Sequence, residues 1–434
     1  MSTFDQILPS ISEVLHAHAA DLQKLGAIVV NRDLNGRVRL VVDEKVLDDA
    51  EAKASLDAIV QALLIPLGPH GFPAERMVLF ETDVLAVTQG TPHFLLDGIE
   101  TVTVVDRLAA ETDWARIAPI AKGAPRIVFF SIKGGVGRST ALAVTAWSLA
   151  QQGKRVLVLD LDLESPGLSS SLLPDERRPT FGVTDWLVED LVDNGAAVFE
   201  DMVATSNLSH DGEIYVVPAH GRDPGEYVAK LGRVWMPKVK VGGVRESWST
   251  RLQRLLNDLE KRWQPDVILI DSRAGIDEVA SACVSDLGAQ GVLLFALDGE
   301  QTWSGYSILF RHWHRAGVVR DIRERLQLVG AMIPDVNGVE YFDELRERAW
   351  NAFSEDLYDE VPAGEPTGGR FSFDETDQVA PHYPWPIKWH RGFAVLRSVH
   401  SRLQCIDSDE VATIFGHLLE GVRAITESEG QPHE

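Results

Sequence analysis

Residues 127–140 of this chain are IVFFSIKGGVGRST, an apolar run that leads into a loop with glycines at 134, 135 and 137. The next ten residues, ALAVTAWSLA, are mostly apolar and predict a buried helix. Glycines let backbone N–H groups turn inward without Cβ clashes, and a helix that begins near Arg138 adds the positive end of its dipole. A strand, a glycine loop and a helix in this order predict a phosphate-binding loop.

Acidic residues follow two other apolar runs. Residues 156–159, VLVL, are continuously apolar, as strands of a parallel sheet are, and they lead to Asp160 and Asp162. Residues 267–270, VILI, lead in the same way to Asp271. Ligands of open α/β sheets bind at the carboxyl ends of strands, where a carboxylate can meet Mg²⁺ through water. Capping of the next turn is the alternative for Asp160 and Asp162, and the upstream glycine loop favours the magnesium site.

Residues 133–140, KGGVGRST, resemble the deviant Walker A box, KGGVGK[ST][ST], of the MinD/ParA family of P-loop ATPases, which belongs to the SIMIBI class. The chain is similar to a branch of that family with Arg in the second Lys place. The resemblance covers about residues 126–340 and includes the acidic boxes at 160–162 and 271–275. It implies a doubly wound, mostly parallel α/β sheet of the P-loop NTPase type, with ATP and Mg²⁺ as cofactors.

The same resemblance implies a role for each matching residue. Lys133 would reach across an ATP-sandwiched homodimer to the partner's phosphates, and Asp162 would orient the attacking water, so both are expected to be catalytic. The expected nucleotide-binding residues are Lys133, Gly134, Gly135, Val136, Gly137, Arg138, Ser139, Thr140 and Gly275. The expected metal-site residues are Ser139, Asp160 and Asp271.

Arg138 departs from the pattern of that box. Arg keeps the charge and offers more donors than Lys, but its planar fork differs from the Lys path to the phosphates. We therefore expect ATP binding with slow hydrolysis. The expected function is an ATP-hydrolysing switch that dimerises on binding ATP–Mg²⁺ and regulates or positions an unidentified protein partner. The alternative is an ATP-dependent dimer clamp in which Arg138 suppresses turnover.

Two further classes of function are disfavoured by what the sequence lacks. A metal or cluster carrier of a related scaffold would need a C-x-x-C pair, whereas the two cysteines, Cys283 and Cys405, are far apart. A bacterial tyrosine kinase would usually carry a Tyr-rich tail, which this sequence does not have. The pair His312 and His314 has no acidic or Cys ligand close to it in the sequence, and we interpret it as ordinary core or surface histidines.

The charge of the chain bears on its partners and compartment. The net charge is −24, from 65 acidic and 41 basic residues, so the chain should repel DNA and anionic lipid. A basic stretch at 222–245 keeps nucleic acid open as an alternative, although we favour a loop that compensates acidic surroundings. There is no signal peptide and no apolar run of 18 residues, and the expected last helix at 408–427 is acidic. We therefore expect a cytoplasmic protein with no membrane contact.

Residues 1–120 are expected to form a small accessory α/β domain for docking or dimerisation, and 121–434 the ATPase domain, joined by a linker at 121–125. The patterns in the first domain predict helices at 4–25, at 46–64 (ended by Pro66) and at 108–117. They also predict strands at 27–30, 38–42, 77–80 and 101–105.

In the second domain, helices are expected at 181–200 and 248–263, and strands at 214–218, 291–297 and 327–334, the last of these being the final parallel strand. Residues 354–380 are acidic and rich in Gly and Pro, which predicts an exposed loop. The aromatic, extended segment 381–389 is expected either to close over the nucleotide base or to present a partner surface.

Overall fold

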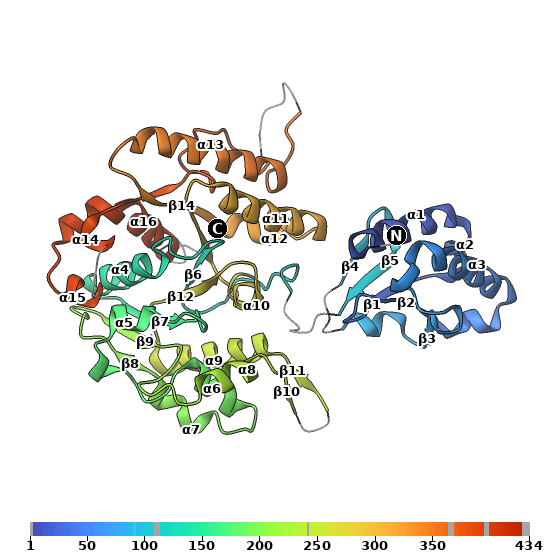
Figure 1. The fold of residues 1–434 in the computed structure, drawn as a ribbon, viewed down its shortest axis with the longest axis horizontal. Helices are drawn as coiled ribbons and strands as arrows, with labels where there is room; N and C mark the ends of the chain where they lie inside the picture. The colour runs from blue at the N-terminus through green and yellow to red at the C-terminus, as the bar shows by residue number, and fades with distance from the viewer. Residues whose placement is uncertain are drawn as a thin grey trace. The chain divides into compact units, whose positions relative to one another are not determined.

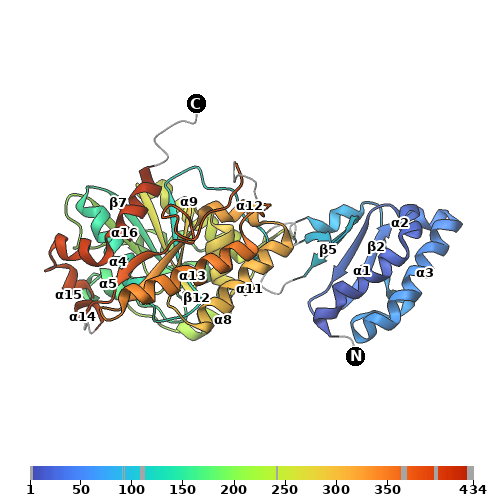
Figure 2. The same cartoon turned by 90° about the horizontal axis from the view of Figure 1, so that it is seen from above.

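The computed structural model describes residues 3–89, 91, 93–107, 113–240, 243–362, 369–394 and 399–427 (Figures 1 and 2). The chain divides into two compact units, Met1–Asp113 and Trp114–Glu434. This division lies before the expected boundary at 120, because the segment after Asp113 bonds to the second unit. The Ala118 N–H donates to the Ser285 carbonyl at 2.7 Å, and the Ala121 N–H to the Gly288 carbonyl at 3.0 Å.

The first unit is a mixed five-stranded sheet with helices against one face. The strand order is β3-β2-β1-β5-β4. The strands are β1 (Ile28–Arg32), β2 (Val38–Asp43), β3 (Val78–Glu81), β4 (His93–Leu96) and β5 (Ile99–Asp106). The helices are α1 (Ile7–Ala17), α2 (Ala19–Leu25) and α3 (Ala50–Leu67). Alternate strand residues such as Val30, Leu40 and Val104 pack with Ile11 of α1 and Leu63 of α3 in one core.

Four strands of the first unit are confirmed, and the helices need correction. The helix expected at 4–25 is two helices that break at His18. Pro66 does not end the second helix, because it sits in the last turn of α3, and Gly68 with φ 52° follows as the cap. Of the helix expected at 108–117, residues 108–112 lie outside the described residues and 113–117 are not helical.

The second unit contains an eight-stranded sheet in the order β15-β14-β13-β6-β12-β7-β9-β8, parallel except for β8 against β9. Its strands are β6 (Arg126–Ser131), β7 (Arg155–Asp160), β8 (Ala204–Thr205), β9 (Glu213–Val217), β12 (Val267–Ala274), β13 (Gly291–Ala296), β14 (Leu326–Ile333) and β15 (Trp385–Lys388). The expected α/β class with a mostly parallel, doubly wound sheet is confirmed.

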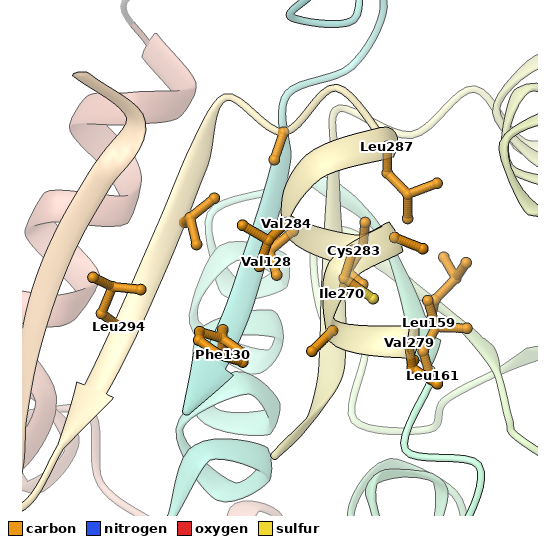
Figure 3. Close-up of a cluster of buried hydrophobic side chains, with 14 of the residues drawn as sticks. Val128, Phe130, Leu159, Leu161, Ile270, Val279, Cys283, Val284, Leu287 and Leu294 are labelled. Atoms are coloured by element: carbon orange, nitrogen blue, oxygen red, sulfur yellow. The ribbon is translucent and has the colours of Figure 1, made fainter. Parts of the chain in front are cut away.

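Helices cover both faces of this sheet, which is why its strands are apolar without alternation. One face carries α4 (Arg138–Gln151), α5 (Leu168–Leu172), α15 (Val399–Leu403) and α16 (Ser408–Glu427). The other carries α6 (Val183–Asp190), α7 (Ala196–Phe199), α8 (Tyr227–Val234), α9 (Trp248–Trp263), α10 (Glu278–Ser281), α11 (Glu300–Ala316), α12 (Val319–Ile322) and α13 (Gly338–Asp356). Figure 3 shows the face that α6 to α13 cover, where Val128 and Phe130 of β6 lie near Cys283 and Val284.

Two short strands, β10 (Lys238–Val239) and β11 (Arg245–Glu246), form a hairpin, and α14 (Arg391–Ala394) precedes α15.

Two expectations for the second unit are wrong. The helix at 181–200 is broken between α6 and α7, where Asp193 takes a left-handed φ of 63°. The strand at 327–334 is not the last parallel strand, because β15 pairs with it in parallel register, Val329 opposite Trp385. The segment 381–389 contains this edge strand, and its Trp385 ring packs against Gly421 of α16. Its expected role, at the nucleotide base or at a partner surface, stays a prediction.

The acidic segment 354–380 is partly anchored rather than an exposed loop. Residues up to 356 still belong to α13, and 363–368 lie outside the described residues. Asp359 accepts two hydrogen bonds from Arg323, at 2.7 and 3.1 Å, and Glu375 pairs with Arg346 at 3.2 Å. The helices predicted at 248–263 and 408–427 are confirmed as α9 and α16.

Candidate nucleotide and magnesium site

The glycine loop joins β6 to α4 at the carboxyl end of the sheet. Gly135 and Gly137 have φ values of 75° and 77°, a region that side chains with a Cβ rarely enter. A Cβ built on Gly134, Gly135 or Gly137 would meet no atom of the described residues within 4 Å, so the space beside the loop is open. The 14-residue helix α4 begins at Arg138 and directs its N-terminus at this space. Phosphate oxygens fit such a loop.

The flanking residues of the loop divide between surface and interior. Lys133 is exposed, Val136 and Arg138 are buried, and Ser139 and Thr140 are half-buried. Gly275, directly after β12, has a φ of 102°, and its N–H donates to the Ser131 carbonyl at 2.9 Å. A phosphate contact from the Gly275 amide therefore requires that hydrogen bond to break.

Two buried carboxylates stand beside the loop on neighbouring strands. Asp160 of β7 and Asp271 of β12 are directly opposite each other in the parallel register. They are 0% and 1% exposed, respectively. Within the described part of the chain, the Oδ2 atoms of both residues are buried without a hydrogen-bond partner. Buried acceptors are normally satisfied, so these two oxygens are available to a ligand.

Arg138 binds the acidic residues instead of pointing into the open loop. Its Nε donates to Asp271 Oδ1 at 2.6 Å, and its Nη2 to Asp162 Oδ2 at 3.3 Å. Its Nη1 donates to Ser131 Oγ at 3.1 Å. The sequence did not predict these hydrogen bonds, because no spacing pattern relates Arg138 to Asp271, Asp162 and Ser131.

The electrostatics of the site follow from burial. Burial raises the pKa of Asp160 well above its ordinary value, and Asp271 and Asp162 raise it further by repulsion. Burial also raises the pKa of Asp271, although Arg138 and Ser139 act in the opposite direction. Burial alone would lower the pKa of Arg138, but the neighbouring carboxylates raise it. Arg138 therefore stays positively charged, and its single charge faces the carboxyl groups of Asp160, Asp162 and Asp271.

Asp162 lies half-buried at the start of the segment after β7. Its Oδ1 accepts from the Ser165 N–H at 3.2 Å, and its Oδ2 accepts from Arg138. The neighbouring Leu163 carbonyl accepts from the Tyr227 hydroxyl of α8 at 2.7 Å, a contact that the sequence did not indicate. Arg273, in the acidic box at 271–275, pairs with Glu164 at 2.6 Å and with Asp277 at 3.0 Å, so it is held by protein carboxylates.

The chemistry of these groups suits Mg²⁺ that arrives with phosphates. Over the residues that the structure describes, there is no group of three or more His, Cys, Asp or Glu that could hold a metal. Mg²⁺ in phosphate sites takes one or two protein ligands and completes its shell with phosphate oxygens and water. The Ser139 hydroxyl and the unpaired Oδ2 of Asp271 fit that requirement, with Asp160 behind them.

Three of the six basic residues in the stretch 222–245 pair with carboxylates of their own unit. Lys230 pairs with Asp185, Lys238 with Asp190 and Lys240 with Glu246, at 2.5, 3.1 and 3.1 Å. These pairs favour the interpretation that the stretch compensates acidic surroundings. His314 Nδ1 lies 3.0 Å from the Asp356 carbonyl, and Trp313 is fully buried in the core, which fits the structural interpretation of this segment.

A parallel sheet with a glycine loop after one strand and acidic residues at the ends of two others defines a P-loop nucleotide-binding domain. The family model described as "CobQ/CobB/MinD/ParA nucleotide binding domain" matches residues 127–365. The chain belongs to this family, as the glycine box predicted.

Individual relatives match over shorter stretches. The septum site-determining protein MinD of Escherichia coli K12 is 28% identical over 151 residues, which is 35% of this chain and 45% of that protein. A putative arsenical pump-driving ATPase of Aquifex aeolicus is 45% identical over 53 residues, 12% of this chain and 13% of that protein. The chain thus spans less than half the length of these relatives.

Among solved structures, MinD of Pyrococcus horikoshii complexed with Mg-ADP is similar at 19% identity, with a TM-score of 0.41 over 71% of this chain and 100% of that chain. The MinC:MinD complex of Aquifex aeolicus is similar at 15% identity, with a TM-score of 0.40 over 72% of this chain and 99% of that chain. None of the helices in the described ranges is long and apolar enough to cross a membrane.

Proposed function

We propose that this protein is an ATP-binding and ATP-hydrolysing switch that dimerises on binding ATP–Mg²⁺ and so regulates or positions a protein partner. The observation that carries the proposal is the open glycine loop beside two buried carboxylates, each with an oxygen that has no hydrogen-bond partner among the described residues. A loop of this kind binds phosphates, and unpaired carboxylate oxygens next to it suit the accompanying cation.

The proposed roles divide the site by position. The backbone N–H groups of residues 134–140 receive the phosphates, with Thr140 at the α-phosphate. Ser139 and Asp271 would hold Mg²⁺, supported by Asp160. When bound, Mg²⁺ would neutralise negative charge that develops during phosphoryl transfer. Asp162 orients a water whose oxygen attacks the γ-phosphorus as the bond to the bridging oxygen breaks, which yields ADP and phosphate.

Lys133 is proposed to act on the facing subunit. Its side chain is exposed at the mouth of the loop, whereas Arg138 is buried and turned toward Asp271. An exposed cation in this place can neutralise the phosphates of a second copy when two subunits close face to face. Catalysis of this kind rests on positioning and charge stabilisation.

The hydrolysis-poor clamp remains the second candidate, and the bonds of Arg138 favour it over fast turnover. The three donor nitrogens named above already serve Asp271, Ser131 and Asp162. A guanidinium held in this way supplies less charge to the γ-phosphate than a Lys that points along the loop. The switch and the clamp share ATP binding and dimerisation and differ in the rate of phosphate release.

Light scattering and phosphate release, each with and without ATP–Mg²⁺, test the proposal. We expect a dimer only with ATP–Mg²⁺, and Lys133→Ala should bind ATP but stay monomeric. Lys261→Ala is the matched control, because this exposed Lys lies on α9, away from the loop. Unchanged dimerisation of Lys133→Ala would overturn its role across the interface. Phosphate release that is equally low in wild type and Asp162→Ala would establish the clamp.

A further inference from the structure

The acidic residues of the site are more numerous than the cations that face them. Asp160, Asp162 and Asp271, which we name the acidic triad, surround the guanidinium of Arg138. Two members of the triad are at least 99% buried, and each has an Oδ2 atom with no partner among the described residues. Buried carboxylates that lack enough compensating charge attract a cation strongly.

Arg138 takes the place that such a cation would otherwise occupy. Its three nitrogens reach the end of β6, the end of β12 and the segment after β7, at 2.6 to 3.3 Å. The planar guanidinium makes these bonds from three separate nitrogens, whereas a Lys would have to make them from a single ammonium nitrogen. The Arg138 side chain is only 7% exposed, so water contributes little to the charge balance there.

We propose that Arg138 is a built-in counter-ion that makes Mg²⁺ binding conditional on nucleotide. Before nucleotide binds, the guanidinium offsets part of the charge of the acidic triad and places its own positive charge beside Asp271, so a divalent cation gains too little there to bind alone. Phosphates bring negative charge and oxygen ligands to the loop, and the balance then favours Mg²⁺. This inference rests on the proposed function in that it takes the acidic triad as the metal side of the nucleotide site.

The proposal makes Arg138 a positioning residue rather than a phosphate ligand. The bond from Nε fixes Asp271 Oδ1, so the unpaired Oδ2 is the atom left to face an incoming ion. Removal of the guanidinium should therefore have an effect that a loss of structure would not: the nucleotide-free protein should gain a divalent-cation site.

Mn²⁺ alone is the probe, added to the nucleotide-free full chain and followed by electron paramagnetic resonance and by thermal unfolding. Wild type is expected to bind Mn²⁺ weakly and to show no stabilisation. Arg138→Gln should bind Mn²⁺ at least ~10-fold more tightly and gain thermal stability from it. The double variant Arg138→Gln/Asp271→Asn should lose that gain.

Arg155→Gln is the matched control. Arg155 pairs with Asp266 at 3.2 Å at the amino end of the same sheet, where removal of the cation should create no Mn²⁺ response. Tight Mn²⁺ binding by nucleotide-free wild type would overturn the proposal, and this measurement does not depend on whether any variant folds. A folded Arg138→Gln with no gain in Mn²⁺ affinity would overturn it as well.

A second arm separates this inference from the proposed function. ADP is added to wild type, and Mn²⁺ binding is expected to tighten at least ~10-fold. Failure of wild type to bind ATP or ADP would sink the proposed function, whereas the nucleotide-free comparison of Arg138→Gln with wild type would still stand. If nucleotide bound without raising the affinity for Mn²⁺, only the claim that metal binding depends on nucleotide would be overturned.

Discussion

Two buried ionic clusters in the second unit differ in how fully their charges are paired. The acidic triad has one Arg against three carboxylates, and two of its oxygens are unpaired within the described residues. The second, which we name the Asp190 cluster, is formed by residues of α6, α9 and the β10–β11 hairpin. Its members are Asp190, Lys238, Glu246, Arg251 and Arg254.

The Asp190 cluster is fully paired at its centre. Asp190 Oδ2 accepts from Arg251 and Arg254 at 2.9 and 2.8 Å, and its Oδ1 accepts from Lys238 at 3.1 Å. Burial would raise the pKa of Asp190, but these hydrogen bonds lower it to about 2. In the acidic triad the balance is reversed, and the pKa of Asp160 is raised. We infer that the Asp190 cluster stabilises the fold and that the acidic triad binds a ligand.

The largest expected effect comes from removing the centre of the Asp190 cluster. Asp190→Asn should lower the free energy of unfolding by about 3–5 kcal/mol, because it leaves buried cations without their partner. Urea unfolding measures this. Asp193→Asn is the control, since Asp193 also pairs with Lys238 but its side chain is 86% exposed, and its loss should cost under ~1 kcal/mol. A small effect of Asp190→Asn would remove the distinction between the clusters.

The pH dependence of stability should follow the same carboxylate. The pKa of Asp190 falls from 3.8 in the unfolded chain to about 2 in the folded protein. Its stabilising effect is therefore complete above pH ~4 and is lost as the pH falls toward 2, by on the order of 2 kcal/mol in total. The difference in unfolding free energy between wild type and Asp190→Asn should shrink across this window. A constant difference from pH 5 to pH 3 would contradict the lowered pKa.

Much of the second unit was predictable because its determinants are local. Continuous apolar runs identified β6, β7, β12 and β13, and the acidic residues at their ends placed Asp160 and Asp271 at one edge of the sheet. Amphipathic spacing gave α9 and α16 in full. These patterns depend on residues within one element, so a single sequence is enough.

The parts that could not be predicted depend on partners far along the chain. The strand β15 contains Pro386 and pairs with β14 only at the sheet edge, where a missing N–H is tolerated. The bonds of Arg138 join residues 7, 24 and 133 positions away, so its role depends on the folded sheet. The short strand β4 has no strong alternation and was missed for that reason.

The last prediction concerns the acidic triad, where removal of a charge should not lower the free energy of unfolding as Asp190→Asn does. Asp160→Asn should leave nucleotide-free protein as stable as wild type or more stable, by up to ~1 kcal/mol, because it removes a buried charge whose pKa is raised by burial and by its neighbours. The same variant should gain less thermal stability from ATP–Mg²⁺ than wild type does, since ligand stabilisation scales with affinity.

Asp266→Asn is the control for Asp160→Asn. Asp266 directly precedes β12, at the amino end of that strand, and it accepts hydrogen bonds from the Arg155 N–H and Nη2 at 2.7 and 3.2 Å. A paired carboxylate of this kind should lose stability when neutralised, and its response to ATP–Mg²⁺ should not change. Chemical unfolding with and without nucleotide separates the two variants. If Asp160→Asn destabilised the nucleotide-free protein as Asp190→Asn does, the acidic triad would be a structural cluster, and its unpaired oxygens would not mark a ligand site.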